Sequence, residues 1–98
     1  MKLEIIWSPR AEMEFADILS YINSEWNEKV VLNFINSLDG VLIQLSENPL
    51  MFPLFDKKRE IRKCVLNKRV ILFYRLRNEN IELVSLFNTR QNPRKINL

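Results

Sequence analysis

Cationic side chains are the residues of this chain best suited to chemistry or binding. Guanidinium and ammonium groups bind anions and stabilise negative charge that develops during a reaction. The groups that usually move protons are scarce, because the chain has no histidine and only one cysteine, Cys64. We therefore expect no metal, no cofactor, and no Ser-His-Asp or Cys-His pair. The cations that could act together are Arg62, Lys63, Arg69, Arg75, Arg90, Arg94 and Lys95.

The charge of the chain is unevenly distributed. The net charge is only +3, but residues 1–56 hold nine acidic and three basic side chains, a balance of −6. Residues 57–98 hold twelve basic and three acidic side chains, a balance of +9. This asymmetry indicates that the second half faces an anionic partner, either nucleic acid or an acidic protein segment. The alternative is that these cations only solvate an exposed surface.

Two pairs of cations can be placed from their spacing. Arg62 and Lys63 are neighbours on a predicted strand, so they point to opposite faces, and we assign Arg62 to the binding face. Arg90 and Arg94 lie about one helical turn apart and share a side if a short helix forms there. The alternative for this second pair is a solvated C-terminus. The predicted target-binding residues are Arg62, Arg69, Arg75, Arg90, Arg94 and Lys95.

A predicted antiparallel hairpin over residues 70–74 and 81–87 must position these cations. Both runs are rich in β-branched and aromatic residues, and the polar residues 77–80 between them have turn character. Alternate residues of the first run are apolar on both faces, so we expect packing on both sides. Tyr74 is predicted to be a core aromatic with its hydroxyl satisfied at the edge, although it could instead stack on a base or donate a proton.

The remaining elements precede this hairpin. Residues 2–7 form a strand candidate, and Ser8-Pro9 opens a helix that we end near Trp26. Asn27 caps a second amphipathic helix, residues 60–66 form a further strand, and Asn67-Lys68 makes a tight turn. The order predicts an α+β fold, β-α-α-β-β-β, with a helical hairpin on one face of a mainly antiparallel sheet. We expect residues 1–98 to form a single domain.

The segment 48–56 is apolar yet contains Pro49 and Pro53, so it cannot continue the second helix. We expect it to be tucked against the core; the alternative is an exposed docking patch. Trp7 and Trp26 are predicted to pack in the core or between helices, and Cys64 to be a small buried hydrophobe. The sheet surface and the tail that carry the arginines are predicted to remain free for a partner.

Taken together, these segments resemble the RelE/ParE superfamily of bacterial toxins from type II toxin–antitoxin modules. The resemblance rests on their order: WSPRAEMEF, NPLMFP, IRKCVLNKRVILFYR, IELVSLF and TRQNPRK. It implies a small toxin held inactive by a cognate antitoxin, whose flexible segment wraps the toxin surface. It also implies a toxin–antitoxin hetero-oligomer. The start of the chain is too short and too acidic for a signal peptide, and no apolar run is of membrane-spanning length, so we expect a cytoplasmic protein.

The superfamily divides by target. Members that cut mRNA on the ribosome use Lys and Arg residues on the sheet and near the C-terminus, often with a Tyr or His close to the end. This chain has no Tyr after Tyr74, so such a reaction would need Lys, Glu60 or Glu82 to move protons. ParE-type members inhibit DNA gyrase by binding and need no catalytic set. We therefore favour gyrase as the target, with a ribosome-dependent mRNA endonuclease as the alternative. A third reading is an inactive member that only binds its antitoxin.

Overall fold

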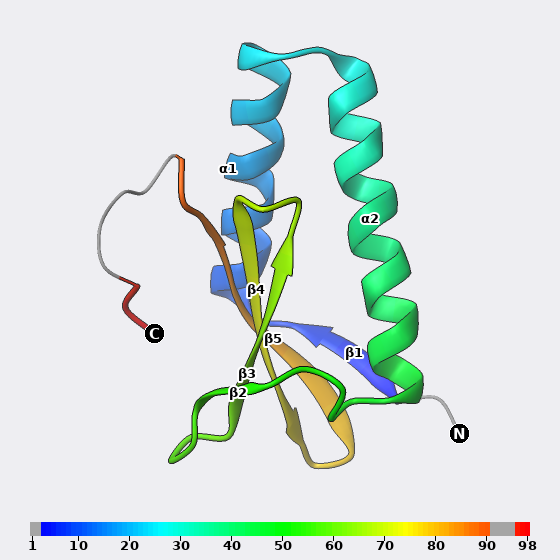
Figure 1. Cartoon of the computed structure of the whole chain (residues 1–98), viewed down its shortest axis with the longest axis vertical. Helices are drawn as coiled ribbons and strands as arrows, with labels where there is room; N and C mark the ends of the chain where they lie inside the picture. Colours follow the sequence, from blue (N-terminus) through cyan, green and yellow to red (C-terminus); the bar gives the residue numbers. More distant parts are fainter. Residues whose placement is uncertain (1–2, 91–95) are drawn as a thin grey trace.

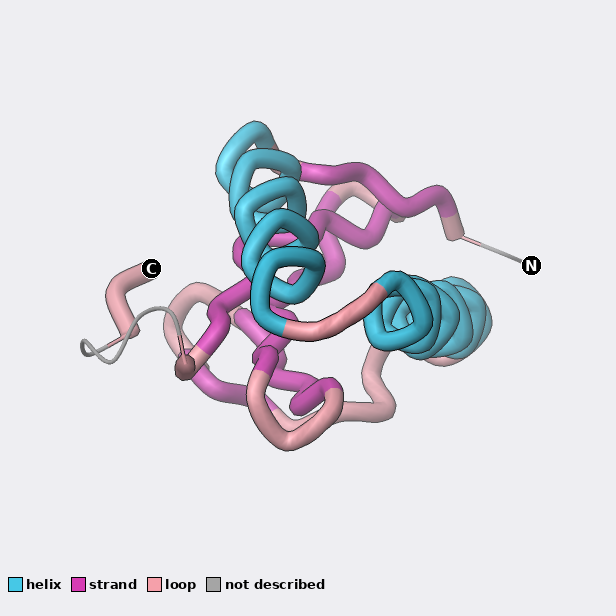
Figure 2. The backbone as a smooth tube through the Cα atoms, turned by 90° about the horizontal axis from the view of Figure 1, so that it is seen from above, coloured by secondary structure: helices cyan, strands magenta, loops and turns pink. Residues whose placement is uncertain are grey.

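A computed structural model describes residues 3–90 and 96–98 of the chain. It has an α+β fold, as predicted, with two antiparallel helices against a five-stranded sheet of order β1-β5-β4-β3-β2. Figure 1 shows the helices side by side, and Figure 2 shows from above the short loop that joins them. The elements are β1 (Glu4–Trp7), α1 (Pro9–Glu25), α2 (Glu28–Glu47), β2 (Leu54–Asp56), β3 (Ile61–Leu66), β4 (Val70–Arg77) and β5 (Asn80–Asn88).

Both helices begin at the predicted caps. The Ser8 hydroxyl accepts a hydrogen bond from the Ala11 amide at 3.0 Å, and Pro9 occupies the first helical position of α1. The Asn27 side chain accepts from the Val30 amide at 3.1 Å. Each cap gives a partner to an amide at the helix start that would otherwise have none. Ser8 and Asn27 therefore determine where the two helices begin.

The two hairpin turns use left-handed backbone at residues other than glycine. Asn67 and Lys68 have φ of 51° and 66°, and the amide of Arg69 donates to the Leu66 carbonyl at 3.2 Å. Between β4 and β5 the loop is only Asn78 and Glu79, with φ of 52° and 63°. Two consecutive positive φ values match the right-handed twist of the flanking strands. The strands therefore extend further than predicted, to Arg77 and from Asn80.

The hairpin is covered on both faces, as predicted. On the helix side, Leu72 and Tyr74 pack with residues of both helices, including Ile18, Phe34 and Leu38. On the far side, the buried residues Ile61, Ile71, Phe73 and Phe87 form a second, smaller core. Alternation along β4 thus supplies two cores at once, which explains why five successive residues, 70–74, are buried.

The cover on the far face comes from the chain itself, so the prediction that the sheet surface carrying the arginines remains free for a partner is wrong on this face. Ile96 and Leu98 pack against the second core, and the ring of Phe55 lies 4.8 Å from that of Phe73. The Arg10 guanidinium donates to the Asn97 carbonyl at 2.8 Å. Large apolar side chains on this face would otherwise be exposed to water, and the chain covers them with its own residues.

The edge of β5 is completed by two different elements. Along its first half it pairs in parallel with β1, from Glu4 opposite Asn80 to Trp7 opposite Leu83. Beyond Leu83, side chains at the start of α1 bond to the edge of β5 in place of β1. The Ser8 hydroxyl donates to the Val84 carbonyl at 3.0 Å.

The carboxylate of Glu14 continues this edge. Its Oε1 accepts from the Leu86 amide at 3.1 Å and from the Ser85 hydroxyl at 2.8 Å, and Arg10 lies 3.4 Å from Oε2. A strand edge that faces a helix cannot pair with another strand, so a side chain supplies the acceptors that the backbone would otherwise lack.

Three smaller expectations meet different outcomes. Trp7 packs against the main core and Cys64 is buried, as predicted. Trp26 is 51% exposed, so its assignment to the core is wrong: it lies at the C-terminal cap of α1, beyond the helix contacts with the sheet.

The expectation that the segment 48–56 is tucked against the core is only partly correct. Phe52 packs against the main core and Phe55 contacts Phe73 of the second core, but Leu50 is 58% exposed. Residues 54–56 form the edge strand β2, which was not predicted; a three-residue edge strand next to Pro53 is compatible with proline's missing amide.

The first prediction concerns Glu14. Glu14→Ala removes the acceptor of the Leu86 amide and of the fully buried Ser85 hydroxyl, so we expect a loss of about 2–3 kcal/mol in the free energy of unfolding. Urea titration followed by circular dichroism measures it. The control is Glu12→Ala, an exposed acid on the same turn, with an expected change below about 0.5 kcal/mol. Equal losses in the two variants would contradict this account.

The second prediction concerns the β4–β5 turn. Glu79→Gly removes a side chain from a left-handed position, where β-carbon contacts cost about 1 kcal/mol, so we expect a modest rise in stability. Thermal unfolding measures it. The comparison variant is Arg77→Gly, two residues earlier in β4, which should lower stability because glycine weakens strands. A fall in the melting temperature of Glu79→Gly would show that the turn is not of this type.

Candidate functional site

The structure brings two of the six predicted binding residues together. Arg69 and Arg90 line one cleft, where the tips of the helices approach the β3–β4 turn. Arg62 and Arg75 lie towards the opposite end of the sheet. Arg94 and Lys95 fall outside the described residues, and their predicted role stays a prediction.

Hydrogen bonds fix the positions of Arg69 and Arg90. The amide and the hydroxyl of Thr89 both donate to the Arg69 carbonyl, each at 2.9 Å. The amide of Arg90 donates to the Asn88 side chain at 3.0 Å. Because Val70 pairs with Asn88 in the sheet, the end of β5 is held beside the start of β4. The two arginines are therefore placed by strand register.

The cleft that they line combines an apolar wall with a cationic rim. It encloses about 310 Å³. The helices supply the apolar and aromatic side chains, and the strands supply Lys68, Arg69 and Arg90. We call this site the basic cleft. Its lining residues are Tyr21, Ile22, Trp26, Val30, Phe34, Asn67, Lys68, Arg69, Val70, Asn88 and Arg90.

The exposed ring of Trp26 forms part of the wall of the basic cleft. The guanidinium carbon of Arg69 lies 5.9 Å from the centre of the Trp26 ring, within range of a cation–π contact. The contact joins the helix tip to the β3–β4 turn and leaves half of the indole in contact with water. Helical spacing places Trp26 on the apolar stripe of α1, so its role in a cleft could not be predicted from its position in the sequence.

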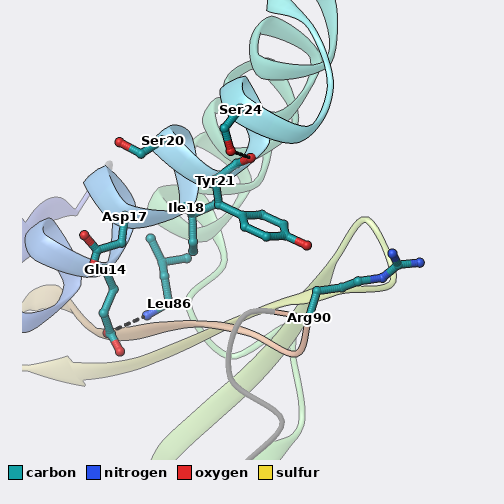
Figure 3. Close-up of a pocket in the computed structure, with 8 residues that line it drawn as sticks. All are labelled: Glu14, Asp17, Ile18, Ser20, Tyr21, Ser24, Leu86 and Arg90. Carbon is teal, nitrogen blue, oxygen red and sulfur yellow. Dashed lines mark hydrogen bonds between the residues drawn. The ribbon is translucent and has the colours of Figure 1, made fainter.

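Arg90 also borders a second hollow, along α1. This hollow encloses about 760 Å³ and is lined by Glu14, Asp17, Ile18, Ser20, Tyr21, Ser24, Leu86 and Arg90. Figure 3 shows the Tyr21 ring projecting from α1 towards the side where Arg90 lies. The Arg90 guanidinium makes no hydrogen bond or ion pair with the residues that the structure describes. Tyr21 and Arg90 thus line both hollows, with their polar groups available to a ligand.

The basic cleft is equipped for binding anions. Among its lining residues in the described part of the chain there is no carboxylate, and the sequence has no histidine. Apart from its cations, Tyr21 is its one titratable side chain. The cleft therefore offers charge-assisted hydrogen bonds and aromatic surface, but few groups that transfer protons.

Arg62 and Arg75 make contacts within the chain. The Nη1 of Arg62 donates to the Phe52 carbonyl at 2.6 Å, and Nε of Arg75 lies 2.6 Å from the Glu82 carboxylate. Their role in target binding stays a prediction, but their positions exclude them from the basic cleft.

Two side chains with reactive groups, Tyr74 and Cys64, are buried. Tyr74 is fully buried and donates its hydroxyl to the Pro49 carbonyl at 2.9 Å, as a core aromatic with a satisfied polar end. Burial raises the pKa of its hydroxyl and also the pKa of the Cys64 thiol. Neither group ionises readily near neutral pH, so neither supplies a nucleophile or a base.

In residues 3–90 and 96–98, no group of three or more Cys, Asp or Glu side chains is arranged to hold a metal ion. Within the same residues, no helix has the length and apolar character needed to cross a membrane.

Comparison with known protein families gives a match over most of the chain. Residues 5–93 match the sequence model described as the ParE toxin of the type II toxin–antitoxin system parDE. No curated protein sequence matches.

Solved structures share the fold at low sequence identity. One is from the chromosomal ParDE toxin–antitoxin system of P. aeruginosa, with a TM-score of 0.74, 10% identity, and coverage of 89% of this chain and 96% of that one. Another is from the E. coli DinJ-YafQ toxin–antitoxin complex, with a TM-score of 0.61, 14% identity, and coverage of 93% and 97%.

A third similar structure is the solution structure of the conserved hypothetical protein HP0894 from Helicobacter pylori, with a TM-score of 0.51, 18% identity, and coverage of 90% and 96%. Identities this low show a shared fold only. The match to the family model, which spans nearly the whole chain, shows more: the chain belongs to the ParE toxin family of type II toxin–antitoxin systems, within the RelE/ParE superfamily.

Proposed function

We propose that this toxin acts as a non-enzymatic inhibitor of DNA gyrase and that it binds its target through the basic cleft. The observation that carries the proposal is the composition of that cleft: three cations, the exposed ring of Trp26 and the partly buried ring of Tyr21, with no carboxylate or histidine among its described lining residues. Such a surface can bind an acidic target through its cations, but it holds no carboxylate or histidine that could act as a general base.

The cations of the basic cleft would meet acidic groups of the target. Arg69 is held by its backbone contacts to Thr89 and by the Trp26 ring, so little side-chain entropy is lost when it binds. Arg90 has no competing partner in the described residues and can form a paired hydrogen bond with a carboxylate or a phosphate. The excess of positive charge in the second half of the chain would also speed the encounter with an acidic surface.

A cognate antitoxin would neutralise the toxin by covering this site. The chain belongs to a family of toxins from toxin–antitoxin systems, and two of the similar structures come from such systems. An antitoxin that presents acidic side chains to Arg69 and Arg90 would block the target by occupying the same cations.

The alternative is a ribosome-dependent mRNA endonuclease, and one observation favours it. The Tyr21 hydroxyl lies on the side of Arg90, where a proton donor or acceptor and a cation could act on one phosphate. The carboxylates considered from the sequence do not serve here, because Glu82 is paired with Arg75 and Glu60 lies at the far end of β3. The endonuclease therefore depends on Tyr21 or on Lys68, which also lines the basic cleft.

The third prediction tests the basic cleft. Arg90→Gln and Arg69→Gln each remove a cation while keeping polar character, and we expect growth inhibition on induced expression to be lost. We expect inhibition of gyrase supercoiling by the purified protein to fall by about tenfold or more, as for loss of a charged contact. Arg59→Gln, an exposed cation at the turn before β3, is the control and should stay toxic. If both cleft variants inhibit growth like the parent while remaining folded, the site is wrongly placed.

The fourth prediction separates the two targets. Tyr21→Phe removes only a hydroxyl, so a gyrase inhibitor should keep most of its toxicity, with intact transcripts and a DNA-damage response. An endonuclease that uses Tyr21 should lose cleavage of mRNA by about a hundredfold or more. Primer extension on induced cells and a supercoiling assay give the two readings. Rapid transcript cleavage by the parent protein would overturn the gyrase proposal.

A further inference from the structure

A further cleft, distinct from the basic cleft and from the hollow along α1, lies at the opposite end of β4 from the basic cleft. It encloses about 310 Å³ and has three leucines beside two cations. We call it the leucine cleft. Its lining residues are Leu50, Leu54, Lys57, Glu60, Arg62 and Leu76.

The leucines of this cleft are unusually exposed. Leu50 is 58% exposed, Leu54 41% and Leu76 40%. They come from three separate segments, and strand register gathers them: Leu54 of β2 pairs with Arg62 of β3, which pairs with Tyr74, two residues before Leu76 in β4. Single exposed leucines are ordinary, but three around one cleft form a patch of the kind that binds another molecule.

Arg62 gives the cleft a fixed polar group. Its Nη1 is anchored by the carbonyl of Phe52 at 2.6 Å, with that of Leu50 at 3.4 Å. The N–H groups on Nε and Nη2 have no partner among the described residues, so they remain able to bind an anion. The anchoring segment is itself held by the hydrogen bond from Tyr74 to Pro49. The guanidinium is therefore positioned before any ligand arrives, which lowers the entropy cost of binding.

The neighbouring strand adds a backbone feature. β2 is the outermost strand of the sheet, and no strand in the described part of the chain pairs with its outer edge. An extended segment of another chain can pair with such an edge. Because β2 has only three residues and a register shift between Leu54 and Asp56, the side chains of the cleft carry most of the binding.

From these observations we propose that the leucine cleft binds an extended segment of a partner protein in which a carboxylate side chain adjoins large apolar side chains. The carboxylate pairs with the free N–H groups of Arg62, with Lys57 nearby, and the apolar side chains cover the three leucines. This site is separate from the basic cleft and does not depend on gyrase being the target.

The chemistry of the cleft disfavours two other occupants. Its described lining has no aromatic ring on which a nucleic acid base could stack, and three leucines offer nothing to phosphates or sugars. A second copy of this chain, docked by a two-fold axis at the cleft, would bring together two clefts of the same net positive charge, because each has Lys57 and Arg62 but only one acid, Glu60, and this costs binding energy.

The fifth prediction tests the proposal with a defined probe. A short fluorescent peptide of alternating aspartate and leucine should bind the full-length protein in an anisotropy titration, and alternating aspartate and serine should bind about tenfold more weakly or not at all. Leu76→Ser and Leu54→Ser should each weaken binding of the leucine peptide by about tenfold. Arg62→Lys should also weaken it, because it keeps the charge but loses the planar fork.

Matched variants separate the outcomes. Ile43→Ser changes a leucine-sized side chain that is 57% exposed on α2 and should leave binding unchanged, as should Arg90→Gln in the basic cleft. Circular dichroism confirms that each variant is folded. Equal binding of the two peptides, loss of binding in Arg90→Gln but not in Leu76→Ser, or self-association that Leu54→Ser abolishes would each overturn the proposal. The toxicity of Arg90→Gln is read separately, so failure of one site leaves the other standing.

Discussion

Burial of β4 on both faces is the constraint on which the rest of the structure depends. Five successive residues, 70–74, lie under cover, so the chain must supply apolar material to both sides of one strand. The helical hairpin covers one side, and Phe55, Ile96 and Leu98 cover the other. With both faces occupied, the ends of β4 are the places where polar groups gather beside apolar walls. The two clefts lie there, one at Val70 and one at Leu76.

The two ends of β4 differ because different side chains surround them. At the helix tips, Tyr21 and Trp26 contribute rings, and Lys68, Arg69 and Arg90 contribute charge. At the other end, the chain leaving α2 contributes Leu50 and the strands contribute leucines, with a single anchored guanidinium. One end is suited to strongly anionic groups and the other to mixed acidic and apolar segments.

Much of the fold was predictable because its signals are local. Ser8-Pro9 and Asn27 mark helix starts by capping, Asn67-Lys68 marks a turn by its backbone preference, and alternation in residues 70–74 reveals two buried faces. The site was only partly predictable. Arg69 and Arg90 were named, but Arg62 and Arg75 could not be told apart from them. Whether a cation is free depends on carbonyls and carboxylates from distant segments, such as Phe52 and Glu82.

The misses share a physical cause. Trp26 continues the helical stripe, yet α1 runs past the sheet at that point, so the stripe has nothing left to cover. The segment 48–56 looks like core material, yet two prolines and the covered sheet leave no room for all of its side chains. Tyr21 carried no spacing signal at all. Apolar content predicts a preference for burial, but only the arrangement of the other elements decides whether a buried position exists.

The hydrogen bonds between the start of α1 and β5 also bear on the order in which the chain folds. Ser8 bonds to Val84 across 76 positions of sequence, and Glu14 bonds to Leu86 across 72. Contacts so far apart require closure of a long loop before they return any free energy, whereas the helical hairpin and the β3–β4–β5 meander close short loops. We expect those local units to assemble early and β1, together with the start of α1, to dock last. Until that late step, the edge of β5 that faces β1 and α1 has no partners for its backbone groups, and the chain is most vulnerable to pairing with a strand of another molecule.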